Sequence, residues 1–299
     1  MKALNLLFFI LLTASTHAWA QQKNEQITVD GLKREFITYV PAGSTDYGKM
    51  PVIISLHGRL GTADRQMKFA NFKPIADREK VIIVCPQGID RSWNDGRETP
   101  ANTKGINDVK FIDQLISYII DIYNADASRI YVTGMSNGGF MTSRLACELN
   151  SRIAAIAVVA ASMDKDMSYQ PTKPMPAMYI QGTKDPLVPY AGGLMRKGAK
   201  GAIYGHEDIL KKWAVADNCD NKPEITTLPV KVDDGTSVTK EEYSCPNGLK
   251  VIGFTVVDGG HTWPGGSQYL PKFIIGPRSK NINACEEIWK FFKENRKGS

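Results

Sequence analysis

The sequence predicts an α/β fold with a mostly parallel central sheet and helices on both faces. Two observations carry this prediction. Short, continuous apolar runs recur along the chain, which is typical of parallel strands buried on both faces. Segments with one-face helical spacing alternate with these runs, and that alternation favours a parallel sheet. The runs are 51–56, 81–85, 130–133, 153–159 and 177–180, and the helical segments are 107–123, 137–149, 206–217 and 281–293.

The remaining elements complete one domain. A hairpin is expected at the Asp30-Gly31 turn, because this pair separates the β-rich stretches 27–29 and 35–40. A last strand, 251–257, precedes the final helix. Residues 186–205, rich in glycine and basic residues, read as a surface loop. Because no linker divides the chain, residues 21–299 are expected to form a single domain.

The first twenty residues have the pattern of an export signal. Lys2 supplies a positive start, an apolar run extends from Leu4 to Leu12, and Ala18-Trp19-Ala20 is an A-x-A cleavage pattern. The run is too short to span a bilayer comfortably. No cysteine follows directly, so a lipid anchor is not indicated. We therefore expect a signal peptide at 1–20 and a mature protein in the periplasm or outside the cell, without a stable membrane anchor.

Composition excludes several classes of function. The 299 residues carry a net charge of +6, from 37 basic and 31 acidic residues spread along the whole chain. Because no basic run or aromatic-basic stripe occurs, nucleic acid is not an expected partner. No cysteine or histidine cluster has the spacing of metal ligands, so no metal site is expected.

Export permits disulfides, and the five cysteines leave at least one unpaired. Cys219 and Cys245 flank an expected hairpin that leads to strand 251–257, so we predict that they pair. The others, expected to be buried thiols, are Cys85, Cys147 and Cys285.

Gly134-Met135-Ser136-Asn137-Gly138 fits the motif G-x-S-x-G. A strand runs into this motif and a helix leaves it, which is the setting in which α/β-hydrolase folds carry their nucleophile. The glycines allow a sharp turn that lifts the serine clear of the sheet. The sequence therefore predicts an α/β-hydrolase fold with Ser136 as nucleophile.

A serine hydroxyl needs a base, and hydrolases of this fold place their residues in the order serine, acid, histidine. His261 alone satisfies that order well, since His57 precedes Ser136, and His206 begins a helix where a surface or capping role is expected. Asp185 is the preferred acid because it follows strand 177–180 and a turn. The rival carboxylates are Asp164 and Asp258.

Backbone N–H groups are expected to stabilise the oxyanion. We predict those of Asn137, beside the nucleophile, and of Arg59, in the loop after strand 51–56, with Leu60 as second choice for that loop. Trp93, Asn94 and Trp263 are candidates for lining the substrate cleft, because aromatic faces suit sugar rings or a phenolic acyl group. The alternative is that these tryptophans only pack the loops.

Five segments carry a more specific resemblance: LHGRLGTA, CPQGIDRSWND, YVTGMSNGGFM, IQGTKDPLVPY and GGHTWPGG. Taken together, these segments resemble those of secreted polyhydroxybutyrate depolymerase-like proteins and of the feruloyl and acetylxylan esterases of carbohydrate esterase family 1. The resemblance implies an α/β-hydrolase fold, no cofactor and acyl-ester substrates. It also implies Ser136, Asp185 and His261 as the catalytic triad.

We therefore expect a serine esterase acting on feruloyl or acetyl esters, as small molecules or linked to plant polysaccharide. The alternatives are a polyester hydrolase, a peptidase of the same fold, or a catalytically silent glycan-binding protein. A silent protein usually lacks a triad member, and none is missing here.

Overall fold

The computed structural model describes residues 20–43, 48–195 and 199–298, which contain a ten-stranded mixed sheet. Its strands lie in the order β1-β2-β4-β3-β5-β6-β7-β12-β11-β10. The block from β4 to β12 is parallel, and antiparallel strands extend the sheet at both edges. The parallel strands are β3 (Met50–Leu56), β4 (Ile82–Pro86), β5 (Ala125–Met135), β6 (Ala155–Val159), β7 (Ala177–Gly182) and β12 (Lys250–Val257). The outer strands are β1 (Gln21–Val29), β2 (Leu32–Val40), β10 (Glu224–Thr227) and β11 (Ser237–Ser244).

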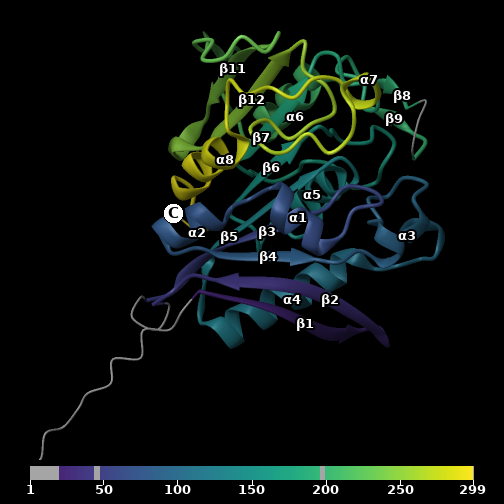
Figure 1. Ribbon diagram of the computed structural model, residues 1–299, viewed down its shortest axis with the longest axis vertical. Helices are drawn as coiled ribbons and strands as arrows, with labels where there is room; N and C mark the ends of the chain where they lie inside the picture. The colour runs from purple at the N-terminus through teal and green to yellow at the C-terminus, as the bar shows by residue number, and fades with distance from the viewer. Residues whose placement is uncertain (1–19, 44–47, 196–198, 299) are drawn as a thin grey trace, which may run out of the picture.

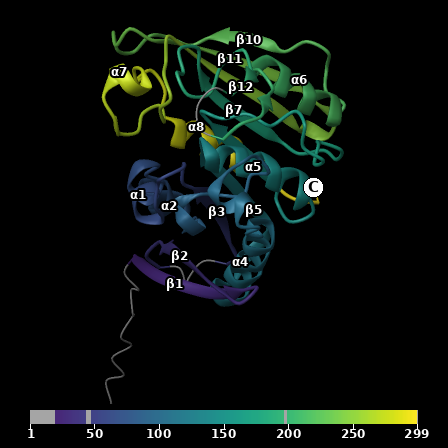
Figure 2. The ribbon, with the colours of Figure 1, turned by 90° about the vertical axis from the view of Figure 1, so that its right-hand side faces the viewer.

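Helices cover both faces of this sheet (Figures 1 and 2). One face carries α4 (Asp108–Tyr123), α5 (Asn137–Glu148) and α6 (His206–Ala216), and the other carries α1 (Ala63–Phe69), α2 (Lys73–Glu79) and α8 (Ala284–Lys293). Strand β3 shows why its sequence is mostly apolar, since both of its faces are buried. Val52 and Ile54 pack into the core under α4 and α5, whereas Ile53 packs into the core under α1, α2 and α8.

Side-chain caps fix where the longer helices begin. The Asn107 side chain accepts the N–H of Lys110 at the start of α4, and Asn283 accepts those of Cys285 and Glu286 at the start of α8. Asn124 takes a left-handed conformation that ends α4. The observed elements confirm the predicted strands and the four predicted helices, with boundaries shifted by a few residues.

Short elements gather where the parallel strands end, at the right-hand edge of Figure 1. They are α3 (Pro100–Thr103), α7 (Lys272–Ile275), and the two-residue strands β8 (Gly193–Leu194) and β9 (Ala202–Ile203). Two 3-10 turns, η2 (Ile89–Arg91) and η3 (Pro246–Gly248), lie in other connections. The predicted loop at 186–205 thus includes the β8–β9 pair.

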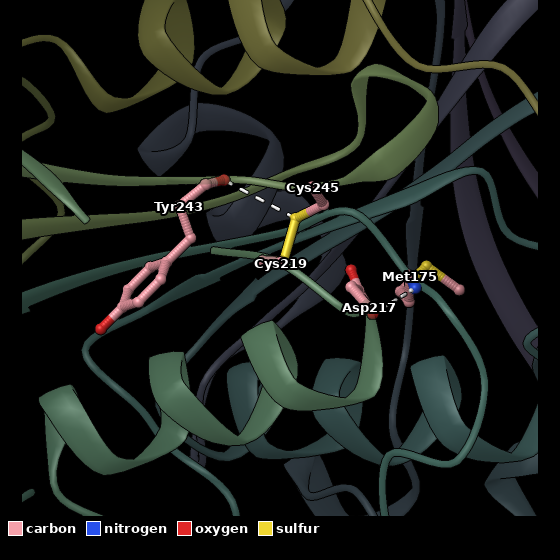
Figure 3. Close-up of a disulfide and its surroundings, with 5 residues drawn as sticks. All are labelled: Met175, Asp217, Cys219, Tyr243 and Cys245. Carbon is pink, nitrogen blue, oxygen red and sulfur yellow. Dashed lines mark hydrogen bonds between the residues drawn. A yellow bond between two sulfur atoms is a disulfide. The ribbon is translucent and has the colours of Figure 1, made fainter. Parts of the chain in front are cut away.

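A disulfide joins Cys219, just after α6, to Cys245, just after β11, as predicted (Figure 3). Cys85 and Cys285 are buried thiols, and burial raises the pKa of Cys285 to about 12. Cys147, expected to be buried, is only partly so, because it lies near the end of α5.

The expected signal peptide falls almost wholly outside the described residues, which begin at Ala20. No helix in the described ranges is both long enough and apolar enough to cross a membrane.

Candidate active site

Ser136 lies in a sharp turn between β5 and α5. Its backbone angles, φ 55° and ψ −125°, belong to a region that residues other than glycine rarely adopt, and such strain is common at functional sites. The neighbouring glycines make the turn possible. A Cβ on Gly134 would lie 2.4 Å from the carbonyl oxygen of Gly138, and one on Gly138 would lie 2.5 Å from that of His57. The motif therefore contains glycine where a side chain has no room, and the serine remains partly exposed.

The structure brings His261 and Asp185 together. Asp185 follows β7 and His261 follows the neighbouring parallel strand β12, so both lie at the carboxyl edge of the sheet where Ser136 also lies. His261 Nδ1 is 2.8 Å from Asp185 Oδ2, and both residues are buried. The other carboxylate oxygen accepts the N–H groups of Leu187 and Val188, each at 2.8 Å. These two bonds orient the carboxylate toward the imidazole.

This pairing determines which ring nitrogen of His261 is free. With its Nδ1 proton donated to Asp185, the histidine presents Nε2 as the basic nitrogen. Among the described residues, no hydrogen bond joins Ser136 to His261. Catalytic hydrogen bonds often tighten only when substrate is bound.

Neither rival carboxylate bonds to His261. Asp258 lies at the surface and pairs with Lys184 at 2.9 Å. Asp164 is buried and accepts the N–H of Asp166 at 2.8 Å. Of the three aspartates, Asp185 alone is placed to orient the histidine.

The other two histidines have different surroundings. His57 Nε2 accepts the N–H of Gly88 at 3.0 Å, and burial lowers the His57 pKa to about 4. His206, expected at the surface or in a cap, is buried instead, so that expectation is wrong. Its ring stacks on Tyr190 with centroids 5.1 Å apart, in space left by the missing side chain of Gly253. Burial lowers the His206 pKa to about 4, which keeps the ring neutral near pH 7.

The predicted oxyanion donors differ in whether their N–H groups are free. Asn137 is the first residue of α5, so its N–H has no acceptor within the helix. In the described parts of the chain, the N–H of Arg59 has no acceptor either. The N–H of Leu60 donates to the carbonyl of Arg91 at 2.8 Å and is therefore occupied. The first choice, Arg59, fits an oxyanion hole better than Leu60.

The two tryptophans predicted to line the cleft do not do so. Trp93 and Trp263 have no exposed surface, so neither offers a face to a sugar or phenolic ring. The Trp93 ring packs against the His57 imidazole with ring centroids 4.9 Å apart, and the Trp263 ring packs against Phe69 and Phe72. Long-range packing has turned both indoles inward, which leaves the alternative, that they pack the loops.

Asn94 is partly exposed and borders a polar cavity of about 460 Å³ between α4 and α5. Arg144 and Glu148, from the C-terminal half of α5, line the same cavity. Because α5 begins beside Ser136 and runs away from it, this cavity lies two turns or more along the helix from the nucleophile. Neither Ser136 nor His261 lines it.

An exposed apolar segment after His261 was not predicted. The Tyr269 hydroxyl donates to the His261 carbonyl at 3.1 Å, and the His261 N–H donates to the Ile275 carbonyl at 2.6 Å. Between these anchors, Leu270, Phe273 and Ile274 are exposed, Phe273 by 89%. The sequence signal was the apolar content of YLPKFII, outside any expected strand or helix.

One group of potential metal ligands occurs in the described residues. It consists of Asp217, Cys219 and Cys245, whose carboxylate oxygen and sulfur atoms lie within 4.8 Å of one another. Both sulfurs are bonded in the disulfide, and Asp217 accepts the N–H of Met175 at 3.0 Å (Figure 3). Since thiolates and not disulfides bind metals, this group does not fit a metal site.

The profile of the family described as esterase PHB depolymerase, where PHB is polyhydroxybutyrate, matches residues 34–191, more than half of the chain. The chain belongs to this family. The esterase is 26% identical over 279 residues to a protein of Nocardia uniformis subsp. tsuyamanensis named as an esterase, NocK, covering 89% of this chain and 81% of that one. It is 29% identical over 238 residues to feruloyl esterase B of Piromyces equi, covering 76% of this chain but only 42% of that enzyme.

The fold has solved counterparts. The acetyl xylan esterase from Aspergillus awamori superposes with a TM-score of 0.58 at 16% identity, covering 80% of this chain and 94% of that one. A thermostable esterase superposes with a TM-score of 0.51 at 21% identity, covering 65% of this chain and 52% of that one. The predicted α/β-hydrolase fold is confirmed. The predicted class of enzyme, an ester hydrolase, is confirmed by the family match and by the named relatives.

Proposed function

We propose that this esterase cleaves carboxylic esters with a triad of Ser136, His261 and Asp185. The observation that carries the proposal is the His261–Asp185 hydrogen bond, at the sheet edge where the strained Ser136 turn also lies. His261 Nε2 removes the serine proton as Oγ attacks the ester carbonyl, and then protonates the leaving alcohol. Water activated by the same nitrogen releases the acid from the acyl-enzyme.

The oxyanion of each tetrahedral intermediate is stabilised in this proposal by the N–H groups of Asn137 and Arg59. Both lack an acceptor in the described structure, which supports the assignment. Preorganised donors of this kind stabilise the transition state because they need no reorientation as charge develops.

The proposed substrates are feruloyl or acetyl esters attached to plant polysaccharide. Relatives named as a feruloyl esterase and as an acetylxylan esterase support this substrate class. The exposed apolar segment at 269–274 also supports it, because its anchors hold it beside His261, where a feruloyl ring needs an apolar contact. We further propose that residues 21–299 form one esterase domain and that residues 1–20 direct its export.

Hydrolysis of polyhydroxybutyrate is the second candidate. The description of the matching family favours it, and an apolar segment beside the site would suit a polyester as well as a phenolic ring.

Release of ferulate and acetate from arabinoxylan, measured beside release of hydroxybutyrate from the polymer, separates the two candidates. We expect the plant esters to be hydrolysed faster, and polymer hydrolysis without ferulate or acetate would promote the polyester. The Ser136→Ala variant serves as the negative control, because it lacks the proposed nucleophile. Loss of a triad serine typically lowers kcat by about a million-fold, so a variant that kept a tenth of the activity would refute the nucleophile.

A further inference from the structure

The two proposed oxyanion donors come from separate parts of the fold. Arg59 lies in the loop after β3, whereas Asn137 begins α5 after the next strand of the sheet. A catalytic pair of N–H groups must be held to within about half an ångström to be effective. Some set of contacts must therefore tie the loop to the helix.

The side chain of Asn137 begins this connection. Asn137 is 4% exposed, and its side-chain amide group forms hydrogen bonds with both the N–H and the carbonyl of Trp93. Asn137 Oδ1 accepts the Trp93 N–H at 2.8 Å, and Asn137 Nδ2 donates to the Trp93 carbonyl at 3.0 Å. Nδ2 also donates to Asp95 Oδ2 at 2.7 Å, and Arg97 pairs with the same buried carboxylate at 2.5 Å. The start of α5 is thus joined to the 93–97 loop.

The indole of Trp93 extends the connection to the other donor. Its Nε1–H donates to the His57 carbonyl at 2.8 Å, and its ring lies against the His57 imidazole. Since His57 Nε2 accepts the Gly88 N–H, the ring proton is assigned to Nδ1, which donates to the Gly58 carbonyl at 2.8 Å.

The last of these bonds acts directly on the proposed donor. The Gly58 carbonyl and the Arg59 N–H belong to one planar trans peptide, so the direction of one group sets the direction of the other. His57, Trp93 and Asn137 are each at most 4% exposed, and water cannot readily replace their hydrogen bonds. A continuous path, buried from Asn137 to His57 and ending at partly exposed Gly58, therefore links one oxyanion donor to the other.

We propose that Trp93 and the side chain of Asn137, acting through His57, form an oxyanion clamp. They are positioning residues, which fix the separation and direction of the Arg59 and Asn137 N–H groups. The inference rests on the proposed function, because it takes those two groups as the oxyanion hole. It also gives buried Trp93 a role that does not require contact with substrate.

The test is Trp93→Phe, which keeps an aromatic ring but removes the indole N–H. The matched control is Trp213→Phe, because Trp213 is equally buried and its Nε1 donates to the Tyr179 hydroxyl at 2.9 Å, in the core under α6. Both variants lose one buried hydrogen bond and comparable volume. Each is compared with wild type for Tm, kcat, KM and inhibition by a trifluoromethyl ketone, whose serine adduct carries an oxyanion.

We expect Trp93→Phe to lower kcat by about 10- to 100-fold, somewhat less than the loss of a whole oxyanion donor. The Ki of the ketone should rise by a similar factor, while KM and the pH dependence of kcat stay close to wild type. Trp213→Phe should lose similar thermal stability and keep its kcat and Ki.

A second pair of variants keeps the test informative if Trp93→Phe folds poorly. Asn137→Asp places a carboxylate against Asp95 and against the Trp93 carbonyl. Adding Asp95→Asn restores a donor and an acceptor between residues 95 and 137 but gives up the charged pairing with Arg97, so the rescue is partial. We expect the single variant to lose kcat and the double variant to recover part of it. Wild-type kcat and Ki in both Trp93→Phe and Asn137→Asp would overturn the clamp. If wild type hydrolysed no ester and did not bind the ketone, the proposed function itself would fail.

Discussion

The substitution Asp185→Asn tests the proposed role of the carboxylate with almost no change of shape. Asp185 Oδ1 accepts two backbone N–H groups, from Leu187 and Val188. An asparagine must keep its carbonyl oxygen at that position, because its NH₂ group cannot accept these bonds. The NH₂ group is then forced to face His261 Nδ1, where Oδ2 now lies at 2.8 Å.

That arrangement reverses the tautomer of the histidine. An N–H donor opposite Nδ1 requires Nδ1 to accept, so the ring proton moves to Nε2 and the base is lost. We expect kcat to fall by about 10,000-fold, equivalent to about 5 kcal/mol of transition-state stabilisation. KM and Tm should change little, because volume and backbone contacts are retained.

The assay is steady-state hydrolysis of a chromogenic ester, with Tm measured on the same samples. Asp258→Asn is the matched control, since that carboxylate lies in the histidine loop but pairs with Lys184 at the surface instead of with the histidine. A fall in kcat of less than tenfold for Asp185→Asn, or an equal fall for Asp258→Asn, would refute the reasoning.

Three further predictions concern stability. Gly138→Ala places a Cβ 2.5 Å from two backbone carbonyl oxygens, so urea denaturation should show a loss of about 3 kcal/mol together with loss of activity; a stable, active variant would contradict the packing argument. Replacing Cys219 and Cys245 with serine should lower the free energy of unfolding by about 3 kcal/mol through the looser unfolded chain, and an unchanged Tm would argue against this. His206 has a pKa of about 4 when folded, against 6.5 without burial, so unfolding takes up a proton between these values and stability falls as pH drops through that window. His206→Phe, which keeps a ring on Tyr190, should reduce the total loss of unfolding free energy across this pH window by up to about 3 kcal/mol. An unchanged loss would show that His206 does not contribute.

The buried strands could be predicted from sequence because each is apolar on both faces. Runs such as 51–56 leave no polar face for solvent, and they fit only the interior of a sheet. The G-x-S-x-G motif was equally informative, since its glycines and the serine conformation depend on local backbone geometry. The short helices were missed because elements of four to seven residues, such as α3 and α1, give too few turns for a periodic pattern.

Side-chain direction in loops could not be predicted. Trp93 and Trp263 lie next to expected cleft positions in the sequence. Whether an indole points outward depends on residues far along the chain, such as His57 for Trp93 and Phe72 for Trp263. His206 is a similar case. Its helix position was predicted, but its burial depends on Tyr190 and Gly253 in other elements.

Labelling of the active site tests the central claim most directly. Purified enzyme is treated with a fluorophosphonate, which phosphonylates an activated serine, and the modified peptide is identified by mass spectrometry. The account predicts one modified residue, Ser136, with loss of esterase activity in step with labelling, and no modification in the Ser136→Ala variant. Stoichiometric labelling of another serine, or full esterase activity with Ser136 modified, would contradict it.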